Sequence, residues 1–152
     1  MLQLLHTHSN VLFTFVIMSW KGKKLYSIFK GKCPVCHEGK VFKHKNVFHP
    51  SKFDKMNSTC ECCGHKYEIE TGFFYGAMYV AYALTVAFSV ATFILTYLVY
   101  SETPYWVYII NILLVLIILA PVTFRAGRLI WMNFFSSYDP NAVKEFKNKE
   151  NE

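Results

Sequence analysis

Two long uncharged segments dominate the pattern of apolar and polar positions along the chain. Residues 71–101 and 103–124 contain no charged side chain, and Glu102 separates them. A helix needs about 20 apolar residues to cross the hydrocarbon core of a bilayer. We therefore predict two transmembrane helices, near 76–100 and 105–124, joined by a loop so short that they form an antiparallel hairpin. The alternative is a pair of helices buried in a soluble core.

The composition and the distribution of charge agree with a membrane protein. Hydrophobic residues make up 53% of the 152 residues and charged residues only 17%, whereas about a quarter of a typical soluble domain is charged. The net charge is +6, and all 16 Lys and Arg residues flank the two uncharged segments. Because basic residues favour the cytoplasmic side of a membrane, we expect both termini to be cytoplasmic. The Lys and Arg side chains are also expected to contact anionic lipid.

The two expected helices carry small and polar side chains at helical spacing. Small residues predict a close-packing face on the first helix, at Gly72, Gly76, Ala83, Ala87 and Ala91. A second stripe of that helix is polar and contains Thr85, Ser89, Thr92 and Thr96. In a hairpin, Asn111 of the second helix would lie opposite Thr92 and Thr96, where it could donate an interhelical hydrogen bond. No Asp, Glu, Lys or His lies inside either helix, so a proton or ion pathway is not expected.

Two pairs of cysteines are the strongest chemical signal in the chain. Cys33 and Cys36 form one C-x-x-C pair, and Cys60 and Cys63 form the other. Each pair turns the chain so that both sulfurs point at one ion, and two pairs give a tetrahedral structural zinc site. We therefore predict a small cytoplasmic zinc-ribbon-like β domain over residues 19–71, stapled by Zn²⁺. Its short strands are expected at 47–49, near Phe53 and at 67–69.

Other interpretations of the cysteines stay open. The run from Cys33 to His37 also matches the C-x-x-C-H haem-attachment motif, but that chemistry would require export of the segment. Iron bound as in rubredoxin fits the same four sulfurs. His37 and His65 flank the pairs and could hydrogen-bond to the thiolates or replace one of them as a ligand. Cys62 lies inside the second pair and is expected to be a free thiol that points away from the metal.

Two arginines, Arg125 and Arg128, follow the second uncharged segment one helical turn apart. One interpretation is that both side chains extend to the membrane surface and bind lipid phosphates. The other is that they clamp the zinc ribbon against the hairpin, with Glu70 pairing to one of them.

The two ends of the chain are expected to lie outside these units. Residues 1–18 contain an apolar run that is too short to span a membrane and lacks the positive start of a signal peptide. We predict that they extend beyond the folded domain, with Met18 as an alternative translation start; an interfacial helix is the alternative. Residues 132–152 are expected to form a polar cytoplasmic tail after the hairpin at 72–131.

Four stretches within residues 27–131 resemble the bacterial family called domain of unknown function 983. They are KCPVCHEGKVF (32–42), CCGHKYE (62–68), GFFYGAMYVAYAL (72–84) and PVTFRAGRLIW (121–131). The resemblance implies a cytoplasmic zinc-ribbon-like start and two helices in the bacterial inner membrane, with no established activity. Some members lie in gene clusters for cytochrome oxidase biogenesis, which implies an assembly role.

These observations favour a non-enzymatic membrane adaptor or assembly factor, with respiratory oxidase biogenesis as the implied setting. No nucleophile–base pair, carboxylate dyad or phosphate loop is visible, so we expect no enzymatic activity. One alternative is a metal- or redox-handling membrane protein in which Cys62 matters. Another is a nucleic-acid-binding module, because zinc ribbons with Lys-rich loops can bind nucleic acid. Since these lysines lie beside the bilayer, we expect lipid and a membrane protein as partners, and no nucleic acid.

Overall fold

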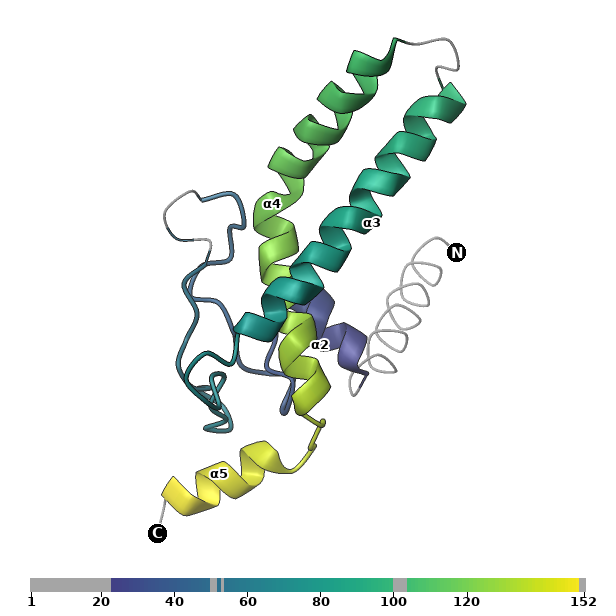
Figure 1. Ribbon diagram of the computed structural model, residues 1–152. Helices are drawn as coiled ribbons and strands as arrows, with labels where there is room; N and C mark the ends of the chain where they lie inside the picture. The colour runs from purple at the N-terminus through teal and green to yellow at the C-terminus, as the bar shows by residue number, and fades with distance from the viewer. Residues whose placement is uncertain (1–22, 50–51, 53, 100–103, 151–152) are drawn as a thin grey trace, which may run out of the picture.

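The structure is a computed structural model that describes residues 23–49, 52, 54–99 and 104–150. Two long helices, α3 (Tyr75–Val99) and α4 (Tyr105–Phe135), run antiparallel side by side (Figure 1). Two short helices, α2 (Lys24–Lys30) and α5 (Ala142–Glu150), lie toward the end of the hairpin where α3 begins and α4 ends. The expected N-terminal extension and the strand near Phe53 lie outside the described residues.

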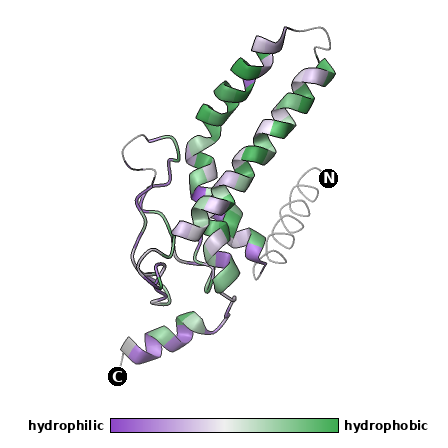
Figure 2. Ribbon diagram, viewed as in Figure 1, coloured by the Kyte–Doolittle hydropathy of each residue, from purple (hydrophilic) through white to green (hydrophobic). Residues whose placement is uncertain are grey.

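Both long helices are long and apolar enough to cross a membrane. Their most apolar 18-residue stretches have mean hydropathies of 1.9 for α3 and 2.7 for α4, and the buried share of these stretches is 0% and 6%. Figure 2 shows hydrophobic residues along the distal part of both helices and hydrophilic residues gathered on α5. Core helices of a soluble protein would be mostly buried, so these two helices indicate a membrane protein with a helical hairpin.

The face of α3 that packs on α4 is the polar stripe. Three small residues of the expected packing face are instead exposed, namely Ala83, Ala87 and Ala91, so that part of the prediction is wrong. In the polar stripe, each hydroxyl donates to the backbone carbonyl four residues earlier in the helix. The four residues are Thr85, Ser89, Thr92 and Thr96. Because these bonds satisfy the hydroxyls within the helix, the stripe can lie against α4. Asn111 donates from Nδ2 to Oγ1 of Thr96 over 3.5 Å, which confirms the predicted interhelical contact.

Glycines bring α3 and α4 closest together at the base of the hairpin. A Cβ on Gly127 would lie 2.9 Å from the carbonyl oxygen of Ala77. Gly76 packs in turn against the indole ring of Trp131, and a Cβ there would collide with the ring. Each helix therefore contributes one glycine to the joint, which is a common way to pack helices closely in a membrane.

Helix α4 continues past the expected end at residue 124 and ends at Phe135. Pro121 lies inside the helix, where neighbouring helices and side chains can satisfy the backbone carbonyl that proline leaves unbonded. Leu129 and Met132, beyond the uncharged segment, are buried against the cysteine-containing segment. The added turns of α4 therefore serve as a packing surface for that segment.

The described part of the cysteine-containing segment has no regular strand. Its strand-like pairing is limited to three isolated bridges, Lys32 with Lys40, Phe42 with Met56 and Thr59 with Lys66. The expected strands at 47–49 and 67–69 are turn and irregular chain, so a β zinc ribbon is not confirmed. The chain turns tightly around each cysteine pair, and the bridges beside the pairs do not extend into a ladder.

This segment, which we call the head (residues 31–71), shares its core with α4. Its buried side chains include Cys33, Val41, Phe42, Cys60 and Tyr67, and Leu129 and Met132 complete the cluster. A buried hydrogen bond links α4 to α2, because Asn133 donates from Nδ2 to Oγ of Ser27 over 3.1 Å, and Ser27 donates in turn to the carbonyl of Lys32 in the head. The C-terminal segment, expected as a polar tail, contains α5. Its Val143 packs on the core and its Phe146 lies against Gly64.

Candidate metal centre

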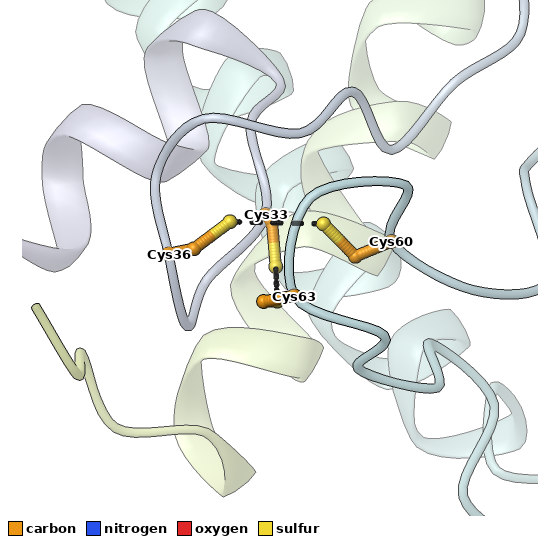
Figure 3. A group of neighbouring side chains, drawn as sticks. All are labelled: Cys33, Cys36, Cys60 and Cys63. Carbon is orange, nitrogen blue, oxygen red and sulfur yellow. Dashed lines mark hydrogen bonds between the residues drawn. The ribbon is translucent and has the colours of Figure 1, made fainter. Parts of the chain in front are cut away.

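The four predicted ligands converge from two loops. Cys33 and Cys36 follow α2, Cys60 and Cys63 precede α3, and their side chains point toward one another (Figure 3). All four Sγ atoms lie within 4.8 Å of one another, with 3.8 Å from Cys33 to Cys63 and 3.6 Å from Cys36 to Cys60. With Zn–S bonds of about 2.3 Å, the sulfurs of a tetrahedral site lie about 3.8 Å apart. The group could therefore hold one metal ion, and Cys62 is not part of it.

The two pairs have the same backbone geometry. The N–H of His37 donates to the carbonyl of Cys33 over 3.0 Å, and the N–H of Gly64 donates to that of Cys60 over 2.9 Å. The residue after each pair has a positive φ, 58° at His37 and 67° at Gly64. In both turns, backbone N–H groups of the pair donate to the sulfur of its first cysteine. Such bonds stabilise a thiolate, which is the form that binds metal.

The pKa values of the thiols indicate that the site needs a cation. Burial, and to a smaller extent the neighbouring sulfurs, raises the pKa of Cys33 to about 12, and burial also raises the pKa of Cys63. Against the effect of burial, hydrogen bonds from Tyr67 and from backbone amides lower the pKa of Cys60 to about 7. Four crowded sulfurs cannot all ionise without a compensating cation. A divalent metal ion would supply that charge and hold all four as thiolates.

Tyr67 and Gly39 support the sulfurs in ways that the sequence did not reveal. The buried Tyr67 hydroxyl donates to the carbonyl oxygen of Lys40 over 3.3 Å and also lies within hydrogen-bonding reach of Cys60. Burial raises the pKa of Tyr67, so its hydroxyl stays protonated, and its single hydrogen is shared between the Lys40 carbonyl and the sulfur of Cys60. Gly39 packs directly on the sulfur of Cys60, and a Cβ there would collide with it. A glycine after the first pair is visible in the sequence, but its contact with the second pair is tertiary.

Neither flanking histidine belongs to the sulfur group. The ring of His37 is buried and packs between Tyr26 and Tyr138, with ring centroids 5.6 Å and 4.4 Å away. His65 is half-buried, its Nε2 lies 3.4 Å from Oγ of Ser136, and burial lowers its pKa. The geometry therefore does not support replacement of a cysteine ligand by either histidine.

The segment after α4 covers both cysteine turns. The N–H of Asp139 donates to the carbonyl of Val35 over 3.0 Å, which fixes this segment to the first turn. Phe146 of α5 packs on Gly64 of the second turn. Cys33, Cys36 and Cys60 are buried, and Cys63 is half-buried. A metal ion held here would be enclosed by protein.

The two arginines of α4 bind the loop that connects the cysteine pairs. Arg125 is only 7% exposed and donates to three successive backbone carbonyls, those of residues 44–46, over 3.0 to 3.3 Å. Arg128 donates to the carbonyl of Asp54 over 3.0 Å. The clamp interpretation is therefore correct, although the Asp54 carbonyl and the Met56 sulfur, and not the expected Glu70, accept the described bonds of Arg128.

One protein family matches the chain over residues 51–134, and its description is protein of unknown function (DUF983). The match includes the second cysteine pair, α3, all but the last residue of α4 and both arginines, whereas the first cysteine pair precedes it. No curated protein and no solved structure matches the chain. Because the match covers more than half of the chain, and two apolar helices beside a four-cysteine group agree with the resemblance of the sequence, this chain belongs to the DUF983 family.

Proposed function

We propose that the protein is a non-enzymatic adaptor or assembly factor for a membrane complex, whose zinc-stapled head presents a binding surface beside the bilayer. The observation that carries this proposal is the closed four-sulfur site joined to the base of the hairpin. Structural zinc sites use four protein ligands, whereas catalytic zinc sites keep one position open. Four cysteines under a cover of protein thus support a structural metal. A respiratory oxidase under assembly is the complex that the family resemblance suggests.

The choice of zinc is testable on the purified protein. We expect one zinc ion per chain by elemental analysis. The zinc should be lost in Cys60→Ser and retained in Cys62→Ser, because Cys60 belongs to the four-sulfur group and Cys62 does not. These two variants form a matched pair, since both remove a thiol from the same turn. Iron in place of zinc would make the metal redox-active. Loss of metal in Cys62→Ser with retention in Cys63→Ser would exclude the proposed ligand set.

We further propose that the protein lies in the bacterial inner membrane with both termini in the cytoplasm. The absence of Lys and Arg between the two helices supports this orientation. Thiolate ligands also suit a reducing compartment. Reporter fusions at Lys144 and at Glu102 should give a cytoplasmic and an exterior signal respectively. An exterior signal at Lys144 would refute the orientation.

An adaptor requires the folded head for partner binding and the hairpin only for insertion. Cross-linking in native membranes followed by purification should recover the same partner with the wild-type protein and with Cys62→Ser. Cys60→Ser should still insert into the membrane but lose the partner, because the head depends on its metal. Equal recovery with Cys60→Ser would show that the head is not the binding element.

A metal- or redox-handling function has one observation in its favour. Cys62 is only half-buried and lies beside Cys60 at the edge of the site. A thiol in this position could react with an oxidant or pass metal to the site. Loss of function in Cys62→Ser, with zinc content unchanged, would favour this alternative over the adaptor.

A further inference from the structure

Three adjoining cavities follow the seam between the head, α3 and α4. The first has a volume of about 840 Å³ and lies over the head, where its lining is mixed polar and apolar. The second, of about 420 Å³, shares Glu68, Phe74 and Arg128 with the first and is otherwise mostly apolar. The third, of about 380 Å³, shares Ala81 and Phe124 with the second and is lined mostly by apolar residues of the hairpin, with two threonines. Together they form a trough that is polar at one end and apolar at the other.

The apolar end of the trough reaches deep into the hairpin. It extends along α4 from Phe124 to Leu113, which at 1.5 Å per residue is about 16 Å. One leaflet of a bilayer has a hydrocarbon depth of about 15 Å, half of the whole core. The apolar part of the trough is therefore long enough for the acyl chain of a lipid in a single leaflet.

The polar end of the trough carries charges of both signs. Arg128 and Lys66 line it together with Asp54, Glu68 and Glu70. Both described hydrogen bonds of Arg128 use Nη1, so its Nη2 atom can donate to a ligand. A headgroup with negative charge alone would meet three carboxylates here. A headgroup that carries both a phosphate and an ammonium group would match both signs.

We propose that this trough is a binding site for a phospholipid with a primary ammonium headgroup, of the phosphatidylethanolamine class. The lipid phosphate accepts hydrogen bonds from Arg128, the ammonium donates to Glu68, and one acyl chain lies between α3 and α4. Glu68 is assigned this role because it lines both cavities that contain Arg128. The site rests on the proposed insertion of the hairpin, but not on the adaptor function or on the identity of the metal.

Two substitutions test the two ends of the site without removing a buried anchor. Glu68→Gln removes the charge of an exposed side chain and keeps nearly the same shape. Glu61→Gln is the control, because Glu61 is also exposed and lines none of the three cavities. Ala120→Phe fills the apolar end, and Ala91→Phe is its control on an exposed position of α3 outside the cavities. Arg128 itself is unsuitable because it also holds the loop at Asp54.

The measurement is native mass spectrometry of the full chain in detergent, titrated with phosphatidylethanolamine or phosphatidylglycerol of identical acyl chains. The wild-type protein should bind phosphatidylethanolamine roughly tenfold more tightly, since the two lipids share the phosphate and differ in the ammonium. Glu68→Gln should reduce this preference to near unity, whereas Glu61→Gln should keep it. Ala120→Phe should weaken the binding of both lipids, whereas Ala91→Phe should not.

Equal binding of the two lipids to the wild-type protein would overturn the proposal, as would an unchanged preference in Glu68→Gln. A lipid-independent change of oligomeric mass in Ala120→Phe would show that a second copy of the chain, and not lipid, fills the trough. Zinc content measured on the same samples separates these outcomes from a failure of the head to fold.

Discussion

Single residues set the geometry of the two cysteine turns. The position after each pair needs a positive φ, which glycine adopts without cost, and Gly64 meets this need in the second turn. His37 occupies the equivalent position of the first turn with φ 58°, a conformation that costs a non-glycine residue about 1–3 kcal/mol. The contacts of its ring with Tyr26 and Tyr138 offset this cost. The two turns thus reach one backbone shape by different means.

Gly39→Ala should weaken metal binding although Gly39 is not a ligand. The added methyl group would collide with the sulfur of Cys60, and overpacking of a buried site costs about 1–3 kcal/mol. Metal content after dialysis against a weak chelator measures the effect. Gly31→Asn is the control, because a Cβ at Gly31 meets no atom within 4 Å and asparagine tolerates its φ of 63°. Equal metal retention in both variants would contradict the prediction.

Spacing alone was enough to propose the ligands but not the residues that support them. Two C-x-x-C pairs identify Cys33, Cys36, Cys60 and Cys63 because each pair is a local turn. Tyr67 and Gly39 act on Cys60 through contacts between distant parts of the chain, and no local pattern encodes such contacts. The extents of α3 and of the apolar part of α4 were also readable, because hydrophobic runs determine them directly.

At the scale of helices, the sequence did not show which face of α3 packs on α4. Small residues favour close approach in membranes, yet Ala83, Ala87 and Ala91 are exposed while the threonine stripe faces α4. The hydroxyls satisfy themselves on their own helix and so cost little at the interface. They also leave Thr96 available to Asn111 of the partner helix.

Asn111→Leu should weaken the packing of α3 on α4 by about 0.6 kcal/mol, the average of interhelical hydrogen bonds in a membrane protein. The lost bond is the one from Nδ2 to Oγ1 of Thr96. A double-mutant cycle with Thr96→Val, read by reversible unfolding in mixed micelles, isolates this pair from the other effects of each substitution. Additive effects of the two substitutions would mean that the bond contributes nothing.

Arg125→Lys should release the loop between the cysteine pairs. A lysine ammonium group lacks the planar fork that reaches three carbonyl oxygens at once, and hydrogen bonds to charged groups contribute about 1.5–3 kcal/mol. Trypsin cleavage at Lys43 and Lys45 should therefore become faster in the folded protein. Arg128→Lys is the comparison. Because Arg128 donates to the carbonyl of Asp54, this substitution should speed trypsin cleavage near Lys55 instead. Unchanged cleavage at Lys45 in Arg125→Lys would contradict the clamp.

At the scale of the whole molecule, the head and the hairpin share one core. A head of about forty residues has too little apolar surface to fold alone, and α4 supplies Leu129 and Met132 to its core. This requirement explains why α4 continues beyond the apolar segment and why α5 packs on the cysteine turns. A hydrophobicity pattern detects the membrane part of α4 but not its last turns, whose partners lie elsewhere in the sequence.

Removal of the metal should unfold the head while the hairpin persists. Protonation or chelation of the thiolates removes an interaction that contributes about 10–16 kcal/mol in small zinc domains, whereas hydrogen bonds within each helix hold α3 and the distal part of α4 in lipid. Hydrogen exchange of the chelated protein should become fast over residues 31–71 and in α5, which packs on the head. It should stay slow over Tyr75–Val99. The same chelator loaded with zinc is the control, and a head that stays protected after metal loss would show that its core with α4 is sufficient without the ion.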